Sequence, residues 1–357
     1  GSIKGLFIYS CLEIGKVVIL KKMSKRDVMK KVTIKDVALQ TGLSVSTISR
    51  VFNNYGDISD KTIKKVTLAA KELGYTPNSA AKQLSSKKKK IIALIFNEIN
   101  VTPGVAMPLE VLGGVVDNLD KTDYEFVFYA TNSTKQKQKS LKQFCNERDI
   151  TGLIIQGLRI SDPYYQELAT FDLPTVAIDL DIENDKVGTV STDNVKAAFE
   201  MTRLLINLGH KNIIFINGTK MATVAQARES GYLAATEHSQ IFYANFSENE
   251  AYQWAIDYAK NKGFKKEDAI FAASDIMAIG IIKAFRTLNL VNKVAVAGFD
   301  DITLASYITP SLTTVRQDIR KISEYAVRNL ICQIETGEVK HRFIPFQIIE
   351  RESTSMS

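Results

Sequence analysis

The pattern of apolar and polar positions changes character near residue 90. Before it, three stretches repeat apolar residues three or four positions apart, as amphipathic helices do, beginning near Ile34, Val45 and Ser59. After it, short apolar runs alternate with longer amphipathic stretches, which indicates strands alternating with helices. The chain therefore predicts a small helical unit followed by a larger α/β body.

Residues that start and stop helices bound the front stretches. Thr33 and Ser59 precede two of them, and Ser44 precedes the one between. Each hydroxyl is suited to cap the first backbone N–H groups of a helix, and Asp36 completes a capping box with Thr33. Gly42 ends the first helix, since glycine readily adopts the left-handed conformation found there. Gly74 does the same for the third helix.

Two short helices around a glycine turn, braced by a third, predict a helix-turn-helix, a unit that places the start of its second helix in the DNA major groove. Arg50 can donate two hydrogen bonds to a guanine edge. The other positions are predicted to meet base edges (Val45, Ser46) or phosphates (Ser44, Thr47, Ser49). A plain three-helix bundle is the alternative interpretation.

The body predicts parallel sheets covered by helices on both faces. Buried strands are expected at residues 91–96, 126–129, 152–156, 175–178, 213–216, 269–273 and 294–297. Helices are expected between them, for example at 196–208, 250–262 and 276–288. So many strands in about 260 residues favour two lobes. Ligands of such sheets bind beyond the carboxyl ends of the strands, here in the cleft between lobes.

Charge separates the two parts of the chain. Residues 1–90 hold 19 Lys and Arg against 6 Asp and Glu, whereas the whole chain has a net charge of only +7, so the body carries a net charge of −6. A basic front unit is typical of a protein that binds nucleic acid. The three cysteines, Cys11, Cys145 and Cys332, form no CxxC pair and support neither a disulfide framework nor a zinc site. We expect a cytoplasmic protein.

The first residues of the chain read as a segment outside the fold. Their apolar run is interrupted by charged residues and lacks a small-residue cleavage site, so it is a poor membrane span and a weak signal peptide. We expect residues 1–31 to be a non-native or disordered leader, with Met23 or Met29 as the natural start.

The stretch from Val32 to Asn53, VTIKDVALQTGLSVSTISRVFN, closely resembles the DNA-binding motif of the lactose-repressor/galactose-repressor (LacI/GalR) family. The likeness continues through GYTPN at 74–78 and AKQL at 81–84, which is similar to that family's hinge helix, and then more loosely to about Glu352. The matching stretches add Thr33, Asn53 and Asn78 to the candidate DNA contacts.

The hinge resemblance implies that two copies of the chain pair on DNA. Leu84 matches the leucine that enters the minor groove as an apolar wedge, and Ala81 supplies the small contact surface beside it. The alternative is that Leu84 packs against the sensor. The tail 351–357 shows no heptad pattern, so we expect a homodimer on a near-palindromic operator rather than a tetramer.

The resemblance also implies a periplasmic-binding-protein-like sensor with an effector site. Arg228 matches an arginine that clamps hydroxyls or a carboxylate, and Asp300 matches a carboxylate that accepts sugar hydroxyls. Phe246 matches an aromatic that stacks on the ligand, Ser274 stands where many members have asparagine, and Asp179 is a weaker candidate at a strand end. The alternatives are a surface arginine, a helix-capping Asp300 and a core Phe246. The implied effector is a sugar or sugar phosphate.

These observations predict an N-terminal all-α helix-turn-helix domain and an α/β two-lobed sensor. The expected boundaries are 32–77 for the DNA-binding domain, 78–90 for the hinge and basic linker, and 91–357 for the sensor, with lobe 1 at about 91–188 and 317–343 and lobe 2 at about 189–316 and 344–357.

We expect a transcription repressor under allosteric control, without catalytic residues, cofactor, metal or membrane contact. His210, His238 and His341 have no nucleophile or metal partner at motif spacing. The alternatives are a global catabolite regulator controlled by a phosphoprotein partner and a sugar-binding transport protein. An enzyme on an α/β scaffold is disfavoured because no site for one is visible.

Overall fold

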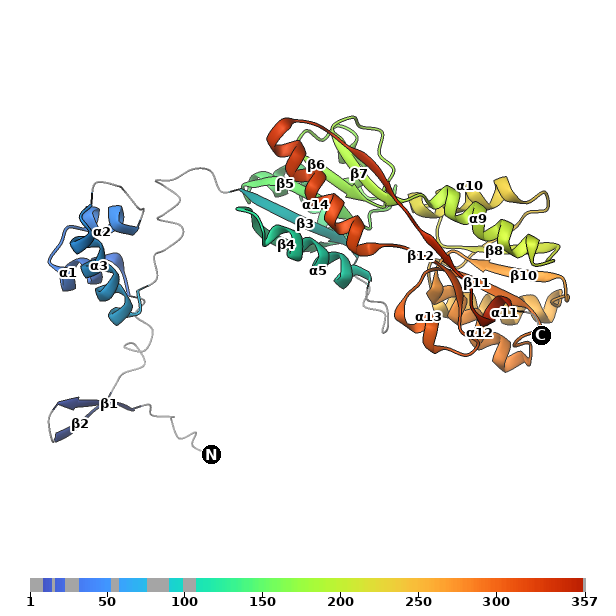
Figure 1. Ribbon diagram of the computed structural model, residues 1–357, viewed down its shortest axis with the longest axis horizontal. Coiled ribbons are helices and arrows are strands. Elements are labelled where there is room, and N and C mark those ends of the chain that lie inside the picture. Colours follow the sequence, from blue (N-terminus) through green and yellow to red (C-terminus); the bar gives the residue numbers. More distant parts are fainter. Residues whose placement is uncertain are drawn as a thin grey trace. The chain divides into compact units, whose positions relative to one another are not determined.

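The computed structural model describes residues 9–14, 17–22, 32–52, 58–75, 90–98 and 107–355 (Figure 1). The chain divides into two compact units, residues 1–88 and 89–357, which are described separately.

The first unit begins with a two-stranded antiparallel ribbon, β1 (Tyr9–Ile14) and β2 (Val17–Lys22). This ribbon lies within residues 1–31, which the sequence analysis interpreted as a non-native or disordered leader, and that assignment stays a prediction. The run Val17–Val18–Ile19 favours a strand, because β-branched residues favour extended backbone.

Three helices form the rest of the described first unit: α1 (Ile34–Thr41), α2 (Val45–Phe52) and α3 (Asp60–Leu73). Their ends follow the predicted caps. The Asp36 carboxylate accepts the backbone N–H of Thr33 at 2.7 Å, and Ser59 accepts the N–H of Thr62 at 3.4 Å. Gly42 and Gly74 have φ values of 66° and 65°, the left-handed conformation that ends a helix with little strain for glycine.

The helices enclose one small core. Its buried members come from all three helices: Val37, Ala38, Ile48, Val51, Val66, Ala69 and Ala70. Burying this set holds α2 against α1 and α3 by a single face, because short helices are stabilised mainly by packing rather than by propensity.

The second unit contains two six-stranded sheets, each with helices packed against it (Figure 1). The first sheet has strand order β13-β7-β6-β5-β3-β4 and is parallel throughout. Its strands are β3 (Ile91–Asn97), β4 (Glu125–Thr131), β5 (Ile150–Gln156), β6 (Thr175–Ile178), β7 (Val187–Thr192) and β13 (His341–Ile344). The helices of this lobe are α5 (Met107–Leu119), α6 (Ser133–Gln138), α7 (Leu141–Asn146), α8 (Pro163–Leu168) and α14 (Ile319–Thr336).

Alternate side chains of β3 enter different cores. Ile92 and Leu94 pack in the core formed with α5 and α14, whereas Ala93 and Ile95 pack in the core formed with α7 and α8. A strand buried on both faces is apolar at every position, which is why the run at 91–96 shows no alternation in the sequence.

The second sheet has strand order β14-β12-β11-β10-β8-β9, and only β14 is antiparallel to its neighbour. Its strands are β8 (Asn212–Asn217), β9 (Gln240–Tyr243), β10 (Asp268–Ala272), β11 (Ala295–Asp300), β12 (Thr313–Arg316) and β14 (Gln347–Ile349). The lobe is completed by α9 (Asn194–Asn207), α10 (Thr223–Ala235), α11 (Glu248–Asn261), α12 (Asp275–Leu288), α13 (Thr303–Tyr307) and a 3-10 turn, Glu352–Thr354.

The chain passes between the two sheets three times: after β7, between β12 and α14, and between β13 and β14, the last seen as the red ribbon in Figure 1. Strand β7 belongs to the first sheet as far as Thr192, so the first crossing comes later than the position near 188 expected from the sequence. All three crossings lie near the carboxyl ends of parallel strands, where the candidate effector residues are found.

Candidate functional site

Helix α2 presents a polar face to solvent. Ile48 and Val51 are buried against the other helices, whereas Val45, Ser46 and Arg50 are exposed. The three side chains predicted to meet base edges therefore project from the helix that the packing holds in place. This is the geometry that a helix entering the major groove requires.

Three hydroxyls gather at the start of α2. The Ser44 hydroxyl oxygen accepts the backbone N–H of Thr47 at 3.1 Å and caps the helix. It also lies 2.7 Å from the Ser46 hydroxyl and 2.8 Å from the Thr47 hydroxyl. A helix N-terminus lined with hydroxyls is well suited to a phosphate oxygen, because its backbone N–H groups carry partial positive charge.

The remaining candidate DNA contacts divide into two groups. Thr33 is exposed at the start of α1, and Ser49 is half-buried on α2. Four candidates lie outside the described residues: Asn53, Asn78, Ala81 and Leu84. The hinge interpretation of Leu84 therefore stays a prediction.

The second candidate site centres on Arg228, a buried arginine in α10 with 4% of its surface exposed. Helix α10 lies tightly against α9: a Cβ at Gly231 would stand 2.0 Å from the carbonyl oxygen of Val195. Only glycine permits this approach. It brings Arg228, one turn earlier, against the carboxyl ends of the strands.

The guanidinium of Arg228 is held by three kinds of contact. Its Nε donates to Asn194 Oδ1 at 2.8 Å, and its Nη1 donates to the carbonyl oxygen of Ala273 at 2.6 Å. Its plane lies over the Phe299 ring, 3.7 Å from the centroid. Nη2 is 4.0 Å from Asp300 Oδ1, at the limit of an ion pair. These contacts fix the guanidinium of Arg228 and leave its Nη2 beside the carboxylate of Asp300.

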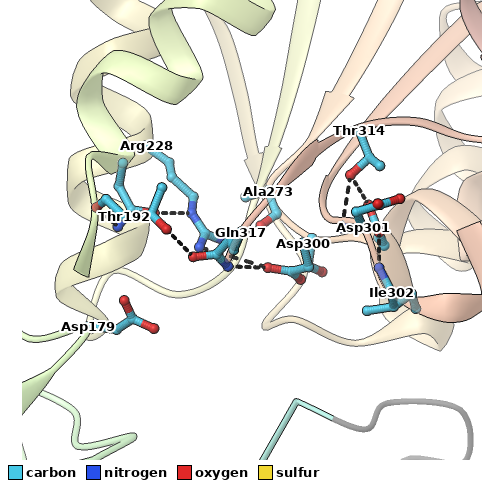
Figure 2. A network of polar contacts seen from close by, with 12 residues as sticks. Asp179, Thr192, Arg228, Ala273, Asp300, Asp301, Ile302, Thr314 and Gln317 are labelled. Atoms are coloured by element: carbon cyan, nitrogen blue, oxygen red, sulfur yellow. Dashed lines mark hydrogen bonds and ion pairs between the residues drawn. The ribbon is translucent and has the colours of Figure 1, made fainter. Parts of the chain in front are cut away.

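Asp300 stands at the end of β11 with a φ of 121°, a conformation that costs a non-glycine residue about 1–3 kcal/mol. Its Oδ1 accepts from Gln317 Nε2 at 2.9 Å, and Gln317 Oε1 accepts from the Thr192 hydroxyl at 2.8 Å. Figure 2 shows Gln317 between Thr192 and Asp300. The network therefore ties Asp300 to two of the crossings between the lobes.

Asp179 faces this network from the first lobe (Figure 2). It follows β6 with a φ of 56°, so it also occupies a left-handed conformation. Oδ1 accepts the hydroxyl of Ser191 at 2.9 Å, and Oδ2 accepts Gln156 Nε2 at 3.5 Å. Strained backbone at both carboxylates is typical of functional sites, where the surrounding structure imposes the conformation.

Burial perturbs every charge in this network. It raises the pKa of Asp300 to about 6 against the opposing effect of Arg228, and it raises the pKa of Asp179. The pKa of Asp275 lies well above its usual value, first through burial and then through repulsion from Asp300. Burial also lowers the pKa of Arg228, although the three carboxylates oppose this.

Ser274 and Phe246, the other two candidate effector residues, contact parts of the second lobe. Ser274 is buried and caps α12, accepting the N–H of Met277 at 3.4 Å. Phe246 has a φ of 55°, and a Cβ at Gly218 would meet its ring at 2.1 Å. Phe246 lines a cavity of about 920 Å³ with residues such as Tyr252. Arg228, Asp300 and Asp179 do not line that cavity.

The sequence analysis missed six residues of the network: Gln156, Ser191, Thr192, Asn194, Asp275 and Gln317. Asp275 has a recognisable sequence signal, since an acidic residue directly after Ser274 is favoured in the first turn of a helix. In the structure it accepts the Thr314 hydroxyl at 2.5 Å. Thr192, Asn194 and Gln317 lie at crossings between the lobes, and short polar residues there carry no local signal.

His210 is buried, and burial lowers its pKa. No set of three His, Cys, Asp or Glu side chains within the described parts of the chain is placed to hold a metal ion. None of the described helices combines the length and apolar character needed to cross a bilayer.

Comparison with known proteins identifies the family of this chain. A model described as "Bacterial regulatory proteins, lacI family" matches residues 33–78, and one described as "Periplasmic binding protein-like domain" matches residues 202–354. The lac repressor dimer bound to operator and the anti-inducer ONPF has a similar fold, with a TM-score of 0.79 and 23% identity over 92% of this chain and 100% of that chain.

Curated relatives match nearly the whole chain. The HTH-type transcriptional regulator RegA of Clostridium saccharobutylicum is 31% identical over 336 residues, 90% of this chain and 99% of the relative. The ribose operon repressor of Halalkalibacterium halodurans is 31% identical over 332 residues, covering 90% and 97%. The chain therefore belongs to the LacI family of bacterial transcription regulators.

Proposed function

We propose that this protein represses transcription by binding a near-palindromic DNA operator as a homodimer, and that a sugar bound between the sensor lobes sets its affinity for that operator. The observation that carries the DNA-binding part is the packing of α2, whose apolar face is buried while Arg50 and Ser46 are exposed. Such a helix reads bases in the major groove.

The sensor part of the proposal rests on the cleft network. A planar guanidinium and carboxylates at the carboxyl ends of parallel strands are the groups that a polyhydroxylated ring requires. Arg228, Asp179 and Asp300 supply them from both lobes. A related protein named a ribose operon repressor supports a sugar as the effector class.

The network also offers a route from ligand to hinge. Gln317 bonds both Asp300 and Thr192, which stand at two of the crossings between lobes. A ligand that displaces Asp300 changes these bonds and therefore biases the lobe arrangement. Coupling of about 1–3 kcal/mol changes operator affinity by roughly 5–150-fold.

We propose no catalytic activity for this chain. Arg228 and the surrounding carboxylates serve binding, as expected in a family of DNA-binding regulators. A role on chromosomal DNA requires the cytoplasm as its compartment.

The proposed function is tested by selecting operators from randomised near-palindromic DNA and measuring affinity by fluorescence anisotropy. We expect the selected sequence to bind about 10³-fold or more tightly than scrambled DNA at physiological salt. Equal binding of both would refute sequence-specific regulation. The mass of the protein–DNA complex should correspond to two chains per operator.

A further inference from the structure

Two consecutive aspartates stand at the end of strand β11, and their carboxylates bond to different partners. Asp300 accepts Gln317 Nε2 at 2.9 Å, whereas Asp301, with a φ of 54°, turns its carboxylate toward two arginines. Figure 2 shows Asp300 beside Gln317 and Asp301 beside Thr314, whose hydroxyl oxygen accepts the Asp301 N–H at 3.4 Å. Asp301 therefore belongs to a second cluster, next to the candidate effector residues in sequence but separate from them in its contacts.

The carboxylate of Asp301 joins two arginines from distant parts of the chain. Arg316 Nε donates to Oδ2 at 2.5 Å, and Arg351 Nη2 lies 2.7 Å from Oδ1. Only 7% of the Asp301 side chain is exposed, so these charge-assisted bonds form where little water competes with them. One carboxylate thus connects the end of β11, the end of β12 and the segment that follows β14.

Arg351 is the fixed member of this cluster. Its Nη1 donates to the carbonyl oxygen of Leu312 at 2.7 Å, and its backbone N–H donates to the Thr313 hydroxyl oxygen at 2.8 Å. Its side chain is 16% exposed, against 48% for Arg316. Arg351 is therefore anchored in the second lobe, and Asp301 links the more exposed Arg316 to that anchor.

Arg316 is the last residue before the second crossing between the lobes. Strand β12 ends at Arg316 and helix α14 begins at Ile319, so Gln317 and Asp318 make up the whole crossing. The far end is also held, because Asp318 Oδ1 accepts the backbone N–H of Lys321 at 3.0 Å and caps α14. A change of lobe arrangement at this crossing is therefore confined to two residues between two held ends.

We infer that Asp301 is a positioning residue for the response to ligand: through Arg316 it holds the base of the second crossing, so that a shift of Gln317 moves the first lobe. This inference rests on the proposed function and concerns how the signal leaves the cleft. A crossing with a loose base absorbs such a shift locally, whereas a fixed base passes it to α14, because packed elements with defined arrangements carry the coupling between sites.

The first test uses Arg316→Gln in the full chain. This variant removes the exposed arm of the cluster and keeps the pair between Asp301 and Arg351, so the second lobe should stay folded. Ribose, glucose and galactose are the probes, and those that raise the melting temperature are used. Their affinities should match the wild type, while the ratio of operator affinities without and with the sugar should be about 2–30-fold smaller.

A purely structural role predicts a different result for Arg316→Gln, namely a lower melting temperature with an unchanged ratio of operator affinities. The matched control is Lys340→Gln, which breaks an ion pair with Glu338 at 3.1 Å and changes a side chain of similar exposure, 42%. The control should keep the wild-type ratio. A wild-type ratio in Arg316→Gln as well would overturn the inference.

A double-mutant cycle tests whether the two residues act as one link. Asp301→Asn should also reduce the ratio of operator affinities, and adding Arg316→Gln to it should reduce the ratio no further, because the link is already broken. Reductions that multiply in the double variant would show that Asp301 and Arg316 act separately, which contradicts the assignment.

Hydrogen exchange decides the positioning role even if the wild type fails to respond to these sugars, a failure that would count against the proposed function instead. In the sugar-free full chain, the N–H groups of Lys321 and Ile322 bond to Asp318 at the start of α14. Mass spectrometry should show faster exchange there in Arg316→Gln and Asp301→Asn, and wild-type exchange in Lys340→Gln. Wild-type exchange in both cluster variants would refute the holding role of Asp301.

Discussion

Replacing Asp300 with asparagine should stabilise the ligand-free protein at neutral pH. Burial raises the pKa of Asp300 from its ordinary value of 3.8 to about 6. Asparagine keeps the shape, tolerates positive φ and carries no charge to desolvate. The substitution therefore removes an electrostatic penalty from a site whose side chain is only 12% exposed.

The direction of the pH dependence follows from linkage. Below about pH 4 the carboxyl group is protonated in both the folded and the unfolded chain. As the pH rises from about 4 to about 6, the unfolded chain releases its proton first, so the wild type loses stability. Above about pH 6 both states are ionised and the loss is constant. A pKa difference of about 2 units corresponds to about 3 kcal/mol.

The assay is urea unfolding of wild type and Asp300→Asn from about pH 4.5 to about pH 7.5. The variant should gain about 2 kcal/mol relative to the wild type over this interval, since part of the shift already acts at the lower pH. The control is Asp149→Asn, which changes an exposed aspartate with a φ of 51° directly before β5 and should not show this gain. If the difference in free energy of unfolding between the wild type and Asp300→Asn does not change with pH, the raised pKa of Asp300 is refuted.

Three further substitutions test other parts of the structure. Arg50→Ala should cost about 1–3 kcal/mol in operator binding and relax specificity at one base pair per half-site; equal losses on operator and scrambled DNA in anisotropy titrations would show a phosphate contact instead. Leu84→Ala should weaken operator binding but leave salt-driven, non-specific binding and DNA-free ligand affinity unchanged, and intact operator affinity would refute the hinge wedge. Gly231→Ala should destabilise the sensor by about 1–3 kcal/mol because its Cβ would meet the Val195 carbonyl oxygen at 2.0 Å. Gly113→Ala is the control, since its Cβ would meet no atom within 4 Å, and equal melting temperatures for both variants would contradict the packing argument.

The front unit was predictable because its signals are local. Thr33 and Ser59 cap helices through residues three positions away, and Gly42 and Gly74 end them through their own backbone. Each of these effects requires no knowledge of the rest of the fold. The strand at 91–96 was predictable from a different local signal, a continuous apolar run that is too short for a typical helix.

The cleft was only partly predictable because its contacts join distant parts of the chain. Arg228 and Asp300 were named from a resemblance, and the structure brings them together. Gln317 and Thr192 bond each other across 125 positions, and neither has a local pattern that indicates this.

The most direct test of the central claim measures operator affinity of the full chain with and without a saturating sugar identified by thermal shift. The account predicts operator affinity at least about 10³-fold above scrambled DNA, and a change of roughly 5–150-fold when the sugar is added. An operator affinity that the bound sugar leaves unchanged would contradict control of DNA binding by the cleft.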